Sequence, residues 1–289
     1  MSDLQFSSPK TVKEAVKILS ASKGKARVLA GGTDLLVQLR AGRMAGSMIV
    51  DIKNIPELRS IKKEKNGFTI GAAVSGAELG THKAINKAWP GVVEGLELIG
   101  STQIQGRASL GGNLCNGSPA ADSVPGLIAA GATCKIAGPK GLRTSKVEDI
   151  VLGPGKTSLK AGEFVVSFFL PTRPKRSGDA YLRFIPRTEM DIAVVGASVS
   201  LTLDKVGVCS EARVSLGAVA PKPLLVAKAA SAIIGTKVDD EALTELSLAA
   251  SAACDPIDDK RGTVEYRTKV AGVLARRAAT IALERARGN

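Results

Sequence analysis

The sequence predicts an α+β protein made of two domains. A strand, a glycine turn, a helix and a second strand follow one another over residues 26–52. A stretch rich in proline and charge, residues 171–178, then separates this part from long alternating strands and three final helices. At 289 residues and 44% hydrophobic composition, the chain can bury a core large enough for two domains. We place them at residues 1–175 and 176–289, and divide the first into subdomains of about 1–56 and 57–175.

The first subdomain begins with a capping-box pattern, Thr11 followed by Glu14, before apolar residues at helical spacing. The pattern predicts a helix over residues 11–21. Strands are expected at 26–30 and 48–52, with a helix at 35–40 that Thr33 or Asp34 would cap. Together these elements form a βαβ unit that closes near residue 55.

The turn within this unit contains Gly31 and Gly32. A strand, a glycine turn and a helix N-terminus present free N–H groups to a phosphate. The Asp34 carboxylate would repel an anion unless it faces away, and GxGxxG is absent. An ordinary turn and a phosphate-binding turn both remain open for this segment.

The second subdomain should contain strands at 68–72, 133–137 and 163–170. Helical patterns cover 76–88, 90–100 and 125–130. His82, the only histidine, lies in the first of these helices without a partner residue nearby, which is typical of a surface residue rather than a catalytic base.

A second glycine segment, residues 109–113, has Asp122 nine residues further on. The surrounding residues 103–122 have the composition of a loop of about twenty residues, which is uncommon unless the loop binds something. Neighbouring Gly111 and Gly112 tolerate positive φ, and their N–H groups can line a concave surface. A plain surface turn is the alternative interpretation.

The second domain should begin with strands at 180–185, 193–203 and 206–219, of which Asp204 and Lys205 join the last two. These strands predict a three-stranded antiparallel meander. Helices are expected at 222–234, 239–253 and 263–287, the last with an apolar stripe typical of core packing.

The composition excludes several classes of function. The net charge is +13, but aromatic residues form only 3% of the chain and the basic residues are scattered, which disfavours nucleic-acid binding. An anionic ligand with an acidic protein partner fits better, and a merely solvated basic surface stays open. Four separated cysteines without a CxxC pair indicate a reducing compartment and argue against a metal site. With no run of eighteen apolar residues and no secretory signal, we expect a cytoplasmic protein without a membrane span.

Three stretches together resemble one family, the FAD-binding medium subunits of the molybdenum hydroxylases. They are LAGGTDLL at 29–36, IQGRASLGGNL at 104–114 and RFIPRTEMDIA at 183–193. That family includes bacterial carbon monoxide dehydrogenase, the flavin domain of xanthine dehydrogenase and 4-hydroxybenzoyl-CoA reductase. The resemblance covers essentially the whole chain, but the cysteine-bearing insertion of the last type is missing.

The resemblance implies a two-subdomain FAD-binding fold of the vanillyl-alcohol-oxidase type, with both glycine segments on the pyrophosphate. Asp122 matches a carboxylate that holds FAD, while Val165 and Arg183 match positions near the isoalloxazine ring. The implied FAD-binding residues are Leu29, Ala30, Gly31, Gly32, Thr33, Asp34, Leu35, Leu36, Ile99, Ser109, Leu110, Gly111, Gly112, Asn113, Asp122, Val165 and Arg183. No catalytic or metal-binding residue is expected.

The implied function is electron transfer within a complex. A large subunit with the molybdenum cofactor would oxidise substrate, and a small subunit with [2Fe–2S] clusters would relay electrons to this FAD. An acceptor such as NAD or a quinone would then take them, in a dimer of heterotrimers. The main alternative is a stand-alone FAD-dependent reductase related to UDP-N-acetylenolpyruvoylglucosamine reductase. A basic scaffold protein without a cofactor is a third possibility.

Overall fold

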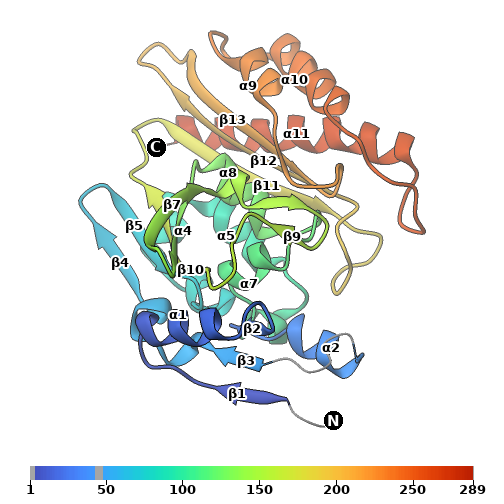
Figure 1. Cartoon of the computed structure of the whole chain (residues 1–289). Helices are drawn as coiled ribbons and strands as arrows, with labels where there is room; N and C mark the ends of the chain where they lie inside the picture. Colours follow the sequence, from blue (N-terminus) through green and yellow to red (C-terminus); the bar gives the residue numbers. More distant parts are fainter. Residues whose placement is uncertain (1–3, 43–47, 289) are drawn as a thin grey trace.

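A computed structural model describes residues 4–42 and 48–288 of the chain. Three larger sheets follow one another along the molecule in the order of the sequence, from the N-terminal sheet at the bottom of Figure 1 to the C-terminal sheet at the top, and a fourth sheet has only two strands. None of the described helices is both long and apolar enough to cross a membrane.

The N-terminal sheet is parallel, with strand order β1-β3-β2. Its elements are β1 (Gln5–Ser7), α1 (Val12–Ala21), β2 (Ala26–Leu29), α2 (Leu35–Arg40) and β3 (Met48–Asp51). The expected βαβ unit is confirmed by the parallel pairing of β2 with β3. Thr11 caps α1 by accepting a hydrogen bond from the N–H of Glu14, whereas Asp34 stands at the start of α2 without a side-chain cap bond.

The central sheet has five antiparallel strands in the order β4-β5-β10-β6-β7. They are β4 (Ile61–Glu64), β5 (Gly67–Gly71), β6 (Thr133–Gly138), β7 (Gly141–Lys146) and β10 (Phe164–Pro171). The three inner strands were predicted, but the charged, exposed outer strands β4 and β7 were not. Edge strands carry such charges because they discourage pairing with another chain.

Helices and short connecting elements surround this sheet. They are η1 (Ile52–Asn54), η2 (Pro56–Arg59), α3 (Gly76–Gly80), α4 (Lys83–Ala88), α5 (Pro90–Glu97), α6 (Thr102–Gln105), α7 (Leu110–Cys115), α8 (Ser123–Ala129), η3 (Val147–Asp149), β8 (Val151–Gly153) and β9 (Lys156–Thr157). His82 is a half-buried N-cap of α4, where its Nδ1 accepts a hydrogen bond from the N–H of Ile85. The expectation that His82 lies within a helix and lacks a partner was therefore wrong.

The expected twenty-residue loop was also wrong, because residues 103–122 contain most of α6 and all of α7. Ser109 starts α7, and its hydroxyl accepts a hydrogen bond from the N–H of Gly112 at 3.2 Å. Gly111 and Gly112 lie inside this helix and do not have positive φ. A serine N-cap followed by Leu110 and Leu114 at helical spacing is the signal that could have revealed the helix.

The C-terminal sheet is antiparallel, with order β11-β12-β13-β14. Its elements are β11 (Ser177–Phe184), β12 (Val195–Leu203), β13 (Cys209–Gly217), β14 (Leu224–Leu225), α9 (Ala227–Ile233), α10 (Asp240–Ala252) and α11 (Val264–Arg287). The predicted meander is confirmed, with a short fourth strand added. That strand pairs with β13, so the helix expected from residue 222 begins only at Ala227.

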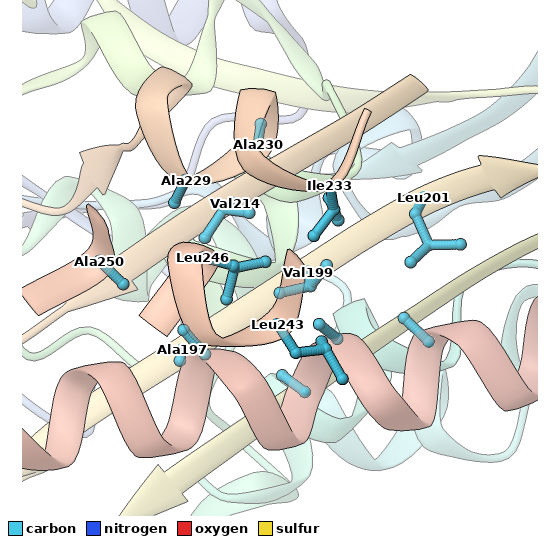
Figure 2. Close-up of a cluster of buried hydrophobic side chains, with 14 of the residues drawn as sticks. Ala197, Val199, Leu201, Val214, Ala229, Ala230, Ile233, Leu243, Leu246 and Ala250 are labelled. Carbon is cyan, nitrogen blue, oxygen red and sulfur yellow. The ribbon is translucent and has the colours of Figure 1, made fainter. Parts of the chain in front are cut away.

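The two faces of the C-terminal sheet pack against different partners. Alternate residues of β12 point toward the C-terminal helices and form a closely packed core with them. Figure 2 shows this core with Ala197, Val199, Leu201, Val214, Ala229, Ala230, Ile233, Leu243, Leu246 and Ala250. The other face lies on α5 and α8 of the central subdomain, so close that a Cβ added to Gly91 would come within 3.1 Å of the Ala180 backbone. The C-terminal domain and the central subdomain are therefore packed so closely that their backbones are in contact.

Candidate functional site

A cavity of about 610 Å³ lies where the first subdomain meets the central one. Its walls come from the turn between β2 and α2, the start of α7, the strand β10 and residues 155–163. A volume of this size is typical of sites for small molecules and cofactors.

The two glycine segments meet at this cavity. A Cβ added to Gly31 would lie 1.9 Å from the carbonyl oxygen of Arg107, two residues before Ser109. No side chain fits there, so glycine is required for the two backbones to approach. A Cβ added to Gly111 would lie 2.6 Å from the carbonyl oxygen of Ala72, so α7 in turn packs directly on the end of β5.

Backbone donors are available at the first glycine segment. Within the part of the chain that the structure describes, the N–H groups of Gly31, Gly32 and Thr33 donate no hydrogen bond. Gly32 has φ of +81°, which turns the chain between β2 and α2. Unpaired N–H groups beside a cavity are suited to an anion. Desolvation raises the pKa of the nearby Asp34 carboxyl.

The structure brings most of the predicted residues to the cavity. Those in its walls are Ala30, Gly31, Gly32, Thr33, Asp34, Leu35, Ile99, Ser109, Gly111, Gly112, Asn113 and Val165. The other five stand behind the walls. Leu29 and Leu36 pack beneath Gly32, and Leu110 is buried in the central core.

Val165 lies in the cavity wall, next to an irregularity in β10. The pairing of β10 with β6 shifts between Val165 and Ser167, which marks a β-bulge. Phe164 and Val166 on either side are both buried in the core between α1 and the central sheet. Glu163, Phe164 and Val165 all line the cavity, so the bulge lies beside this part of the wall, as bulges near binding sites commonly do.

The remaining two predicted residues, Asp122 and Arg183, form a buried ion pair with an Nη1–Oδ2 distance of 3.1 Å. The hydroxyl of Tyr181 donates to the other oxygen of Asp122, also at 3.1 Å. Burial raises the pKa of Asp122 to about 6, against the opposing effect of the Arg183 charge. Burial also raises the pKa of Tyr181, so its hydroxyl stays protonated and remains a donor.

Sequence reasoning missed part of the cavity wall, which includes Ser22, Arg27 and Lys160 among others. Gln38 and Asn116, also in the wall, join α2 to the end of α7 through a side-chain hydrogen bond of 3.3 Å. None of these residues belongs to a motif, and they meet only through the tertiary fold. Among the described residues, no cluster of three potential metal ligands occurs.

The fold and this cavity define a protein suited to binding a cofactor, with two glycine segments in the cavity wall. Residues 2–173 match the family described as the FAD binding domain in molybdopterin dehydrogenase. Residues 180–282 match the C-terminal domain of the carbon monoxide dehydrogenase flavoprotein. The chain belongs to the FAD-binding medium subunits of the molybdenum hydroxylases, and it is therefore an oxidoreductase subunit whose cofactor is FAD.

Individual relatives agree with this assignment. The carbon monoxide dehydrogenase medium chain of Afipia carboxidovorans is 33% identical over 279 residues, which cover 96% of each chain. A putative xanthine dehydrogenase FAD-binding subunit of Escherichia coli is 31% identical, covering 96% of this chain and 95% of its own. Carbon monoxide dehydrogenase from Hydrogenophaga pseudoflava has a solved structure that superimposes with a TM-score of 0.94, at 32% identity and 98% coverage of both chains.

Proposed function

We propose that FAD occupies the 610 Å³ cavity, with its pyrophosphate beside the two glycine segments. The observation that carries this assignment is the contact between Gly31 and the Arg107 backbone, because it brings both segments to one cavity. The unpaired N–H groups of residues 31–33 would hold the negative charge. The residues assigned to FAD binding remain those inferred from the sequence, with Leu29, Leu36, Leu110, Asp122 and Arg183 supporting the walls from behind.

Bound FAD supplies a redox centre that accepts and releases electrons. The chain's own residues would bind and orient it. Ile99 and Val165 offer apolar wall surface that excludes water, and Asn113 offers an amide whose Oδ1 is held by Ser123. The Nδ2 group of Asn113 makes no hydrogen bond within the described part of the chain, so it is a free donor at the cavity.

We further propose that this FAD receives electrons from [2Fe–2S] clusters of a small partner subunit and passes them to NAD or a quinone. A large subunit with the molybdenum cofactor would complete a cytoplasmic complex, a dimer of heterotrimers. The similarity to medium chains along the full length supports this role. The net charge of +13 suits an acidic partner.

We also propose that residues 1–175 and 176–289 are separate domains, and that 1–56 and 57–175 are subdomains of the first. The first family match ends at residue 173 and the second begins at residue 180. In the structure, β10 ends at Pro171 and β11 starts at Ser177. Both facts support a boundary in this short connection.

Anaerobic electron transfer from the FAD-loaded chain tests the proposed role. The chain is reduced chemically and then mixed with NAD or with a soluble quinone while the flavin absorbance is followed. Reoxidation by one of the two supports the proposed path. Steady turnover of a nicotinamide substrate by the isolated chain would instead establish a stand-alone reductase.

A further inference from the structure

Strand β11 presents its two faces to different domains. Ala180, Leu182 and Phe184 pack into the C-terminal core. The alternating residues Asp179, Tyr181 and Arg183 face the central subdomain, where Asp179 accepts a hydrogen bond from the N–H of Gly91. Thus one strand of the C-terminal domain carries a row of polar side chains into the FAD-binding domain.

Two of these side chains converge on Asp122. The Tyr181 hydroxyl donates to Oδ1 and the Arg183 guanidinium to Oδ2, so both carboxylate oxygens are bound from β11. The side chain of Arg183 is 3% exposed and that of Asp122 is 10% exposed. A Cβ added to Gly196 would lie 2.6 Å from the Tyr181 hydroxyl oxygen, so the neighbouring strand fixes the ring in place.

This cluster is connected to the cavity along two short routes. Arg183 Nη1 also donates to the carbonyl oxygen of Leu98 at 2.6 Å, directly before the cavity residue Ile99. Ser123, directly after Asp122, donates from its N–H and its hydroxyl to Oδ1 of the cavity residue Asn113, at 3.1 and 2.7 Å. Two walls of the cavity are therefore attached to the same buried cluster.

We propose that Tyr181 is a positioning residue for FAD, acting through Asp122 to hold the Ile99 and Asn113 walls of the cavity. The inference rests on the proposed location of FAD in this cavity. It makes the C-terminal domain a contributor to FAD affinity, although β11 supplies no residue to the cavity wall. When a buried carboxylate loses one of its hydrogen-bond donors, its negative charge is poorly compensated. The position of Asp122 therefore depends on both of its donors, Tyr181 and Arg183.

The Tyr181→Phe variant tests the proposal because it removes one hydroxyl and keeps the ring. The dissociation constant of FAD is measured on the full-length apo chain by quenching of flavin fluorescence. We expect FAD to bind about tenfold to hundredfold more weakly, as for the loss of a hydrogen bond to a charged group. The matched control is Tyr266→Phe, at the only other tyrosine, which is 43% exposed and should bind FAD like the parent.

A double-mutant cycle with Asp122→Asn separates positioning from general stability. If Tyr181 acts through Asp122, the double variant binds FAD no more weakly than Asp122→Asn alone. The visible circular dichroism of the remaining bound flavin should also change in both single variants. Losses of FAD affinity that add up in the double variant would overturn the proposal. So would a Tyr181→Phe apo chain that melts at a lower temperature but binds FAD with unchanged affinity.

Ser123→Ala provides a second variant in case Tyr181→Phe does not fold. It removes the Ser123 hydroxyl from Asn113 without touching Tyr181, and we expect weaker FAD binding here as well. Unchanged affinity in Ser123→Ala would refute a role for the hydroxyl bond in the route through Asn113, because the variant keeps the bond from the Ser123 N–H. If the parent chain itself bound no FAD, the proposed cofactor site would fail rather than this inference.

Discussion

The two glycine segments at the cavity use glycine for different physical reasons. In the first, Gly32 adopts a φ of +81° and Gly31 touches the Arg107 backbone, so both turning and close approach are required. In the second, Gly111 and Gly112 are ordinary helical residues of α7, and only Gly111 is pressed against another backbone. Two GG pairs that look alike in the sequence therefore carry different constraints, and substitutions at each should separate them.

The largest effect is expected for Gly31→Ala. Its methyl carbon would lie 1.9 Å from the Arg107 carbonyl oxygen, a backbone atom that cannot rotate away. The two segments must move apart, which should cost about 3 kcal/mol of unfolding free energy and abolish FAD retention. Urea unfolding and the flavin absorbance of the purified protein measure the two effects.

Gly153→Ala is the control for this substitution. Gly153 lies at the end of β8 without positive φ, and an added Cβ would meet no atom within 4 Å. Its stability and flavin content should equal those of the parent. A flavin-replete Gly31→Ala protein of parental stability would show that the contact between the segments is not needed.

The second prediction compares adjacent residues of α7. Gly111→Ala places a methyl group 2.6 Å from the Ala72 carbonyl oxygen and should destabilise the chain by about 1–3 kcal/mol. Gly112→Ala meets only the Ser109 hydroxyl, at 3.3 Å, and should leave the apo chain as stable or up to about 1 kcal/mol more stable, since alanine favours helix.

FAD affinity completes this comparison. Gly112 lines the cavity, so its added methyl should weaken FAD binding about tenfold although the apo chain is stable. Titration of each apo variant with FAD, alongside thermal unfolding, gives both quantities. Equal destabilisation by the two substitutions would mean that α7 does not pack on β5 as described.

The sequence predicted those features that depend on local pattern. The βαβ unit, the meander and the last two helices follow from apolar periodicity, which tertiary packing here reinforces. The helical state of Gly111 was missed because glycine pairs are common in turns, and only the serine cap pointed to a helix. The charged edge strands β4 and β7 lack the apolar alternation that identifies a half-buried strand.

The residues of the site also divide into those that a local sequence pattern predicts and those that only the folded structure reveals. The contiguous family motifs contain ten of the twelve predicted residues that line the cavity, and the wider family resemblance supplied the other two, Ile99 and Val165. Arg27 and Lys160 in the cavity wall, and Tyr181 behind it, belong to no motif. The contact between Tyr181 and Asp122 joins residues about 60 positions apart, and such a contact is not encoded in local spacing.

The smallest expected effect concerns Asp122, an ionisable group that lies behind the second segment and is joined to it through Ser123 and Asn113. Burial raises the pKa of Asp122 from 3.8 to about 6, so the folded chain binds this proton more tightly than the unfolded chain. The associated stability is fully present below pH 3.8 and is lost as pH rises through about 6. Between pH 5 and pH 7 this group should lower the unfolding free energy by about 1 kcal/mol.

Asp179 also has a pKa raised to about 6, so the pH dependence of the parent chain's unfolding free energy contains the contributions of both groups. Urea unfolding at the two pH values, compared between the parent and Asp122→Asn, isolates the contribution of Asp122. In the variant, the unfolding free energy should change with pH only through the other groups. An equal change between pH 5 and pH 7 in both proteins would show that Asp122 is already ionised at pH 5.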